Sequence, residues 1–222
     1  MSKEKAARVA AKKIKDKWKT KTWYTILAND SFGKKEIGSS PAQTPDDMIG
    51  RISEVSLSDV TGDFKQSHVK LMFRITKVEG DKAFTEFEGH EINQDYIRRM
   101  IRRRKTRIDS VVDVTTSDNF NLRVKPLLVV DRKIISGIET KLRNKVDEFV
   151  KAKAATMPSD QFIVYMFSPQ ISNDIYEEIK TIYPTRKIEI RKSEIIRNIK
   201  KQMQAEPEAE IDEEEQTDAG VA

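Results

Sequence analysis

The feature that most constrains the fold of this chain is an alternation of apolar and polar residues over positions 68–76. Apolar side chains recur there at every second position, as Val69, Leu71, Phe73 and Ile75. A period of two is typical of a half-buried antiparallel strand. A Glu-Gly-Asp sequence at residues 79–81 then predicts a tight turn, and a return strand begins at Ala83. We therefore predict a hairpin over residues 68–88.

The sequence around this hairpin predicts a larger sheet. Further strands are expected in three apolar runs, at residues 51–60, 108–116 and 122–130. A sheet of this size tends to curl, and closing it removes its exposed edges. Residues 22–130 are therefore predicted to form a curled antiparallel β-sheet or barrel, with one basic helix at 93–105. Segment 29–50 is rich in Gly and Pro and is expected to be a loop.

The pattern changes after Val130. Ile138, Leu142 and Val146 recur at near-helical spacing, whereas residues 162–167 are continuously apolar, as in a strand covered on both faces. The predicted order is helix, strand, helix, strand and helix, at about residues 134–154, 162–167, 170–182, 186–191 and 193–203. Residues 131–203 are thus predicted to be a smaller C-terminal α/β region, and the fold class of the chain is α+β.

The two ends of the chain differ in charge. Residues 1–21 carry nine Lys or Arg against two acids, which predicts a basic arm that is disordered until it meets a phosphate backbone. Residues 204–222 are predicted to be an acidic, disordered tail. Eight acids and no Lys or Arg follow Gln202, so the net charge of +5 for the chain leaves +13 on residues 1–201. This surplus favours a nucleic acid as the partner.

Composition and motifs exclude several classes of function. The chain has no Cys, which removes disulfides, zinc knuckles and thiol nucleophiles. Its two histidines lack the spacing of a metal site; His68 is expected on a solvent-facing strand and His90 at a strand-to-helix corner. There is no Walker loop, glycine-rich dinucleotide fingerprint or elbow serine. Ser67-His68-Val69-Lys70 and Ser117-Asp118-Asn119 imitate two of the three serine β-lactamase signatures, but we reject the match because the first lies in a predicted strand and no Lys-Thr-Gly follows. No apolar run approaches the roughly 18 residues of a membrane span. We expect a cytoplasmic, non-enzymatic protein with no cofactor, metal, membrane or small-molecule substrate.

The strongest functional signal is a run of cations without acids. Seven of the ten residues from 98 to 107 are basic, namely Arg98, Arg99, Arg102, Arg103, Arg104, Lys105 and Arg107. Three of these arginines are expected in the last turn of the predicted helix, where the helix dipole favours cations. A solvated helix face usually mixes both signs, but no acid occurs between Asp95 and Asp109. The run is therefore interpreted as a site for RNA phosphates.

A second candidate lies in the arm, where lysines surround aromatic residues. The residues expected to contact RNA there are Lys12, Lys13, Lys15, Lys17, Trp18, Lys19 and Lys21. An aromatic ring between cations can stack on an unpaired base while the lysines hold phosphates. For Trp23 and Tyr24 the alternative to stacking on a base is that they start the first buried strand, together with Ile26. A weaker third basic patch is formed by Arg186, Lys187, Arg191 and Lys192.

Several motifs occur in a fixed order along the chain. They are Lys17-Trp18-Lys19-Thr20-Lys21-Thr22-Trp23-Tyr24, Gly50-Arg51-Ile52-Ser53-Glu54-Val55-Ser56-Leu57-Ser58-Asp59, Phe87-Glu88-Gly89-His90-Glu91, Val112-Asp113-Val114-Thr115-Thr116-Ser117-Asp118, Tyr183-Pro184 and Arg191-Lys192. With the Arg-rich segment between them, they resemble the archaeal and eukaryotic small-subunit ribosomal proteins called S-one-e, or S-three-A-e. The resemblance covers about residues 15–195, and nothing carries over to the first dozen residues or to the acidic tail.

The resemblance implies a structural constituent of the small ribosomal subunit of an archaeon, acting in translation. It implies a place on the platform, near the 3′ end of the small-subunit rRNA and the mRNA exit. The implied partners are this rRNA and neighbouring small-subunit ribosomal proteins, with contact to mRNA near the exit left open. Two alternatives remain at this point: a free RNA-binding factor of translation or rRNA processing, and a protein scaffold that binds no RNA.

Overall fold

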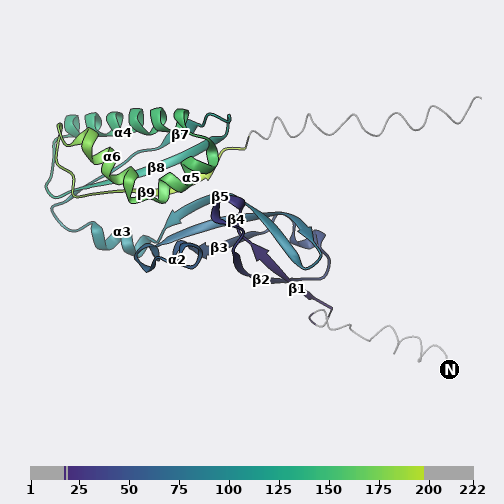
Figure 1. Ribbon diagram of the computed structural model, residues 1–222. Helices are drawn as coiled ribbons and strands as arrows, with labels where there is room; N and C mark the ends of the chain where they lie inside the picture. Colours follow the sequence, from purple (N-terminus) through teal and green to yellow (C-terminus); the bar gives the residue numbers. More distant parts are fainter. Residues whose placement is uncertain (1–17, 19, 198–222) are drawn as a thin grey trace, which may run out of the picture.

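The computed structural model describes residue 18 and residues 20–197 (Figure 1). Its strands are β1 Thr22–Leu27, β2 Glu36–Ala42, β3 Ile52–Ser56, β4 Val69–Glu79, β5 Lys82–Ile92, β6 Thr106–Asp109, β7 Val112–Thr115, β8 Asn121–Val130 and β9 Lys187–Ile195. Its α-helices are α2 Leu57–Thr61, α3 Gln94–Met100, α4 Ser136–Thr156, α5 Ser159–Phe167 and α6 Pro169–Ile179. Short 3-10 helices lie at Asp30–Phe32, Asp46–Met48 and Phe64–Gln66.

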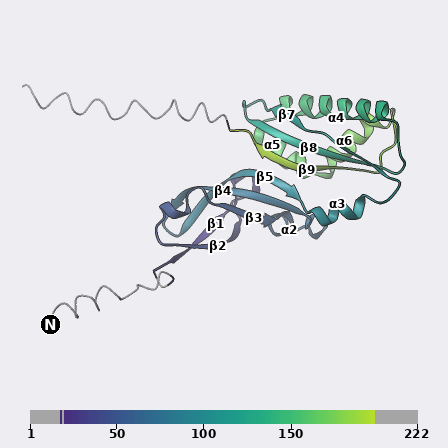
Figure 2. The same cartoon turned by 180° about the vertical axis from the view of Figure 1, so that it is seen from behind.

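The nine strands of the described part of the chain form one mixed sheet that divides at β5. On one side, β5 pairs with β4, which in turn pairs with β3. On the other side, the first residues of β5 pair in parallel with β1, and its last residues pair antiparallel with β9. β8 lies beyond β9, and β6 and β7 follow one another along the outer edge of β8. Figures 1 and 2 show the resulting two parts, β1–β5 in one and β7–β9 in the other.

The two parts share one hydrophobic core. Figure 1 shows α4, α5 and α6 gathered around β7–β9. The main buried cluster includes Phe73 from β4, Leu128 from β8, Val146 from α4 and Phe162 from α5. A second, smaller cluster lies beside β1 and β2. Burial of apolar surface in the main cluster therefore holds the two parts together as well as stabilising each of them.

The predicted hairpin at 68–88 is confirmed and extends to the ends of β4 and β5. Its apolar positions are buried in alternation, as the period of two requires. Gly80 provides the left-handed backbone of the turn, with φ of 57°. The α+β class is also confirmed. The prediction allowed a curled antiparallel sheet or a closed barrel. The structure shows an open sheet, in which β1 and β5 form a parallel pair.

The strand predicted at 162–167 is wrong, because these residues form most of α5. A short, continuously apolar run has no period that separates a buried strand from a buried helix. The helix buries Phe162, Ile163 and Met166, whereas Val164 is about half exposed. One face is therefore buried, at helical spacing. The predicted helices at 134–154 and 170–182 correspond to α4 and α6.

Three other predicted boundaries change. The strand expected at 51–60 ends at Ser56, and α2 follows at once. The loop expected at 29–50 contains β2, which pairs with β1 alone among the described strands and so tolerates Pro41 at the sheet edge. The helix expected at 193–203 is wrong for its first residues, which continue β9. Its remainder from residue 198, the acidic tail and most of the basic arm lie outside the described residues.

Candidate nucleic-acid interface

The basic helix predicted from the sequence is present as α3, at the point where the chain leaves the hairpin. The Asn93 side chain caps the helix by accepting a hydrogen bond from the backbone N–H of Asp95, at 3.2 Å. Ile97 is buried, and Tyr96 and Met100 pack partly against the main core. This apolar side docks α3, so Arg98 and other polar residues face outward.

The helix ends earlier than predicted, at Met100 instead of residue 105. Arg102, Arg103 and Arg104 therefore lie in a turn beyond the helix, which corrects their expected place in its last turn. The turn is closed by a hydrogen bond from the Lys105 N–H to the Arg102 carbonyl, at 3.2 Å. The helix cannot continue because Thr106 already begins β6, which pairs with β8. Tertiary pairing thus overrides the local preference for helix.

Arg104 has an unusual backbone conformation in this turn. Its φ is 70°, in the left-handed region where glycine is the usual residue. A side chain other than Gly or Asn in this region typically costs about 1 kcal/mol. A glycine at this position would adopt the same backbone conformation without that cost.

The cations of residues 98–107 fall into two groups. Arg98, Lys105 and Arg107 pair with Asp95, Asp131 and Asp109, at 3.4, 3.1 and 2.6 Å. The others, Arg99, Arg102, Arg103 and Arg104, are exposed and have no acidic partner within the described part of the chain. These four unpaired arginines together with Arg98 are called the α3 basic surface below. Guanidinium groups without internal partners are free to form bidentate contacts with phosphate.

Two clefts flank α3, and further basic residues line both of them. One, of about 360 Å³, is lined by Arg98, Arg107 and Arg191 among other residues. The second has about 380 Å³, and its basic residues are Arg99, Arg102, Lys105, Arg186 and Lys187. The sequence placed residues 186–192 in a separate, weaker patch. The fold brings Arg186, Lys187 and Arg191 to the clefts beside α3, because the start of β9 pairs with the end of β8, where β6 also begins.

Asp131 connects the two basic segments. Its carboxylate lies 3.1 Å from the Lys105 ammonium and 3.0 Å from the Arg186 guanidinium. Hydrogen bonds from Arg186 and then Lys105 hold the pKa of Asp131 below its ordinary value. This acid therefore stays ionised and holds two cations of the 380 Å³ cleft near one another.

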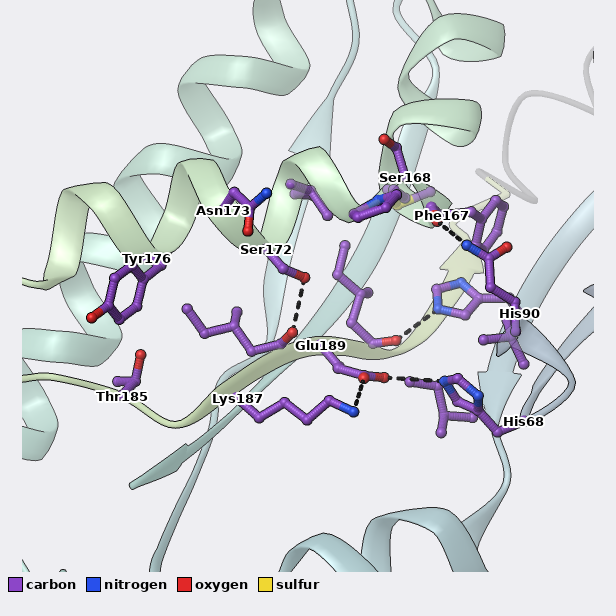
Figure 3. A pocket seen from close by; sticks show the side chains of 18 of the residues that line it. His68, His90, Phe167, Ser168, Ser172, Asn173, Tyr176, Thr185, Lys187 and Glu189 are labelled. Atoms are coloured by element: carbon purple, nitrogen blue, oxygen red, sulfur yellow. Dashed lines mark hydrogen bonds and ion pairs between the residues drawn. The ribbon is translucent and has the colours of Figure 1, made fainter. Parts of the chain in front are cut away.

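A partly buried carboxylate anchors α3 to β9. Glu189 accepts a hydrogen bond from the Tyr96 hydroxyl at 2.8 Å, and it lies 3.0 Å from the Lys187 ammonium, a contact that Figure 3 shows. His68 lies 3.5 Å from the same carboxylate and stacks on the Tyr96 ring. Burial by itself would raise the pKa of Glu189, but the hydrogen bonds from His68, Lys187 and Tyr96 hold it below the ordinary value. His68 is thus in a turn against α3, not on a solvent-facing strand.

His90 is also not where the sequence placed it. It lies within β5, fully buried, and not at a strand-to-helix corner. Its Nε2 is 2.8 Å from the Ile190 carbonyl oxygen and its Nδ1 is 2.6 Å from the Ser193 hydroxyl. The carbonyl can only accept, so Nε2 donates to it and the Ser193 hydroxyl donates to Nδ1. These contacts join β5 to β9 and leave no nitrogen for a metal.

The aromatic residues of the arm lie away from α3. Trp18 is 62% exposed and Trp23 60% exposed, whereas Tyr24 is buried in β1. The Lys21 ammonium lies 4.6 Å from the centre of the Trp18 ring. Figure 1 shows β1 and α3 toward opposite ends of the β1–β5 part, so the structure does not bring these two candidate sites together. The predicted RNA contacts Lys12, Lys13, Lys15, Lys17 and Lys19 lie outside the described residues.

Comparison with known proteins decides the family of the chain. The family model described as the Ribosomal S3Ae family matches residues 9–198. The chain belongs to the Ribosomal S3Ae family. The family resemblance predicted from ordered motifs over about residues 15–195 is thereby confirmed. S3Ae relatives include proteins named small ribosomal subunit protein eS1 from three archaea.

Each of these relatives aligns with more than four-fifths of this chain. The Thermoplasma acidophilum protein is 44% identical over 86% of this chain and 89% of its own length. The Picrophilus torridus protein is 43% identical over 82% of this chain and 87% of its own length. The Saccharolobus islandicus protein is 41% identical over 86% of this chain and 94% of its own length.

One S3Ae motif has a structural role that its sequence did not reveal. In Phe87-Glu88-Gly89-His90-Glu91, Gly89 and His90 pair with Glu194 and Ser193 of β9. The Cβ of any other residue at position 89 would lie 2.3 Å from the Ser193 carbonyl oxygen. This motif therefore closes the junction between the two parts of the sheet.

Within the described residues, no three His, Cys, Asp or Glu side chains are grouped so that they could hold a metal ion. No helix in that part of the chain is long and apolar enough to cross a membrane.

Proposed function

We propose that this chain is a structural protein of the small ribosomal subunit and binds the small-subunit rRNA through the α3 basic surface. Membership of the S3Ae family and the names of its archaeal relatives support the ribosomal role. The observation that carries the rRNA contact is the group of arginines at Arg99 and 102–104, exposed and without acidic partners among the described residues. As a ribosomal component the protein would be cytoplasmic and non-enzymatic.

Binding would proceed by neutralising several phosphates at once. Each guanidinium that replaces a counterion on RNA contributes to affinity, and the contribution falls as salt rises. The sheet and the Glu189 anchor hold α3 in one orientation, so little additional entropy is lost on binding. The basic arm, with Trp18, would supply a second contact at the other end of the β1–β5 part. No bond is made or broken in this mechanism.

The position proposed for the protein within the small subunit rests on the family resemblance. It supports a place on the platform, near the 3′ end of the small-subunit rRNA and the mRNA exit, in contact with neighbouring small-subunit proteins. Direct contact with mRNA is part of the same proposal. High-salt sucrose-gradient sedimentation of a native lysate tests the ribosomal assignment. Stoichiometric, salt-resistant migration with the small subunit supports it, whereas loss in salt indicates a free translation or processing factor.

The α3 contact is tested by changing Arg98, Arg102 and Arg103 together to Ala. We expect weaker binding to small-subunit rRNA, and a salt dependence whose slope falls by roughly one log unit per lost phosphate contact. Filter binding at several salt concentrations measures both quantities.

The matched control changes Lys141, Lys151 and Lys180 together to Ala. These lysines are exposed on or next to the α4 and α6 helices, and their loss removes the same charge. The control should keep the slope of the parent protein. If the arginine variant also keeps that slope, α3 contacts protein and not RNA.

A further inference from the structure

A cleft lies between α6 and β9. It has a volume of about 540 Å³, and its lining extends to His90 in β5. Figure 3 shows Ser172, Asn173 and Tyr176 projecting from α6 on one side, and Thr185 lying below Tyr176 just before β9. His68 and Glu189 also line the cleft, with the His68 Nε2 3.5 Å from the Glu189 carboxylate.

Thr185 gives this cleft an unexplained polar group. The residue is 8% exposed, and its hydroxyl is buried with no hydrogen-bond partner among the described residues. A buried hydroxyl without a partner is costly, and native structures satisfy nearly all such groups. Thr185 lines the cleft, and Figure 3 shows its hydroxyl pointing toward Tyr176, so a ligand that stacks on Tyr176 can supply the missing hydrogen bond.

The mouth of the cleft has features that suit a planar polar ligand. Tyr176 is 40% exposed and presents an aromatic ring there. The Asn173 side chain is exposed, and its amide makes no hydrogen bond within the described part of the chain. A ring for stacking, an amide with both donor and acceptor groups, and a free hydroxyl are the groups that recognise a nucleobase.

The charge around the cleft selects the kind of ligand. Arg186 and Lys187 line both this cleft and the 380 Å³ cleft beside α3, so the two are adjacent. The second cleft adds Arg99 and Arg102, whereas the one carboxylate in the first, Glu189, is neutralised by its neighbours. A ligand that spans both clefts therefore needs a polar ring at one end and negative charge at the other.

We propose that the cleft between α6 and β9 binds one unpaired base of an RNA whose adjoining phosphates lie on Arg99, Arg102 and Arg186. The base stacks on Tyr176 and hydrogen-bonds to Thr185 and Asn173. An RNA strand fits better than a peptide, because only the RNA combines a planar polar ring with a phosphate on each neighbouring residue. This inference rests on the proposed rRNA binding and specifies an unpaired nucleotide as the group recognised.

The test uses the full-length protein and protein-free small-subunit rRNA in filter-binding titrations across salt concentrations. Tyr176→Ala should weaken binding about tenfold, as loss of one stacked base does, but leave the salt slope unchanged because no phosphate contact is removed. Tyr176→Phe is the matched control and should bind like the parent, because the ring remains. Thr185→Val should keep or raise the melting temperature, since it removes an unsatisfied hydroxyl, and still weaken binding.

Ultraviolet cross-linking of the same complexes, followed by mass spectrometry, gives an independent result. We expect a nucleotide attached to the α6 peptide in the parent and its loss in Tyr176→Ala. Parent-like affinity of Tyr176→Ala, or cross-links confined to α3, would overturn the base site and leave the proposed function intact. Cross-linking of α6 to a ribosomal protein in intact subunits, without RNA, would assign the cleft to a protein partner. Failure of the parent to bind rRNA would overturn both proposals.

Discussion

At the residue scale, His90 is a titratable side chain inside the junction of β5 and β9. Burial lowers its pKa to about 4, although the hydrogen bond to the Ile190 carbonyl partly opposes this. The groups in contact with it, Ser193, Ile190 and the Phe167 ring, do not titrate. The folded protein therefore keeps His90 neutral where the unfolded chain already binds a proton.

The free energy of unfolding should consequently fall as the solution is made acidic. The pKa of His90 in the folded protein is lower than its ordinary value of 6.5. Its contribution to the free energy of unfolding is therefore fully present above pH 6.5 and is lost as the pH falls toward 4. Between pH 7 and 5 we expect a loss of about 2 kcal/mol from this residue. Urea denaturation at several pH values measures it.

The variant His90→Gln provides the comparison, because glutamine can still donate to the Ile190 carbonyl but does not titrate. Its stability should be lower at pH 7 and should change less between pH 7 and 5. An equal change in both proteins would show that other groups cause the acid sensitivity.

At the scale of elements, the short pairing between β5 and β9 joins the two parts of the sheet. Only three residue pairs form it among the described residues, from Gly89–Glu194 to Glu91–Lys192. The strands can approach because Gly89 has no side chain in front of the Ser193 carbonyl. Loss of this approach would also separate His90 from Ser193.

We expect Gly89→Ala to destabilise the protein by roughly 2–3 kcal/mol, because the added methyl group meets rigid backbone. Gly38→Ala is the matched control, since Gly38 also lies in a strand but its added Cβ would contact nothing within 4 Å. The control should change stability by about 0.5 kcal/mol or less. Urea denaturation of both variants tests this, and equal effects would show that the close approach at Gly89 is relaxed in solution.

At the scale of the whole molecule, the main hydrophobic cluster crosses from one part of the sheet to the other. The Phe167 ring from α5 lies 6.1 Å from the Phe87 ring of β5, between their centres. β8 and β9 pair along nearly their whole length, although they are far apart in the sequence. We therefore propose that residues 22–197 unfold as one unit.

Native-state hydrogen exchange tests this cooperativity. The most protected amides of β4, near Phe73, and of β8, near Leu128, should exchange with the same opening free energy, because the shared core must open for either strand. Gly89→Ala should lower both values together. A β4 value lower than the β8 value by about 2 kcal/mol or more would instead indicate two independently folding parts.

The sequence alone determined the features that depend on neighbouring residues. The hairpin of β4 and β5 follows from a period of two and a Glu-Gly-Asp turn, and α4 follows from apolar residues at helical spacing. The basic run at 98–107 and the ordered motifs of the S3Ae family are also properties of the linear chain. Local geometry and composition are sufficient for each of these.

Only the tertiary structure decided the features that depend on distant contacts. Residues 162–167 are helical because one face packs into the core, which a uniformly apolar run cannot reveal. α3 stops at Met100 because β6 must pair with β8. Arg186 joins the α3 cations, and Thr185 lines the same cleft as Tyr176, because β9 returns to the sheet beside β8. Long-range pairing sets these positions, and its energy exceeds the local preferences that a sequence displays.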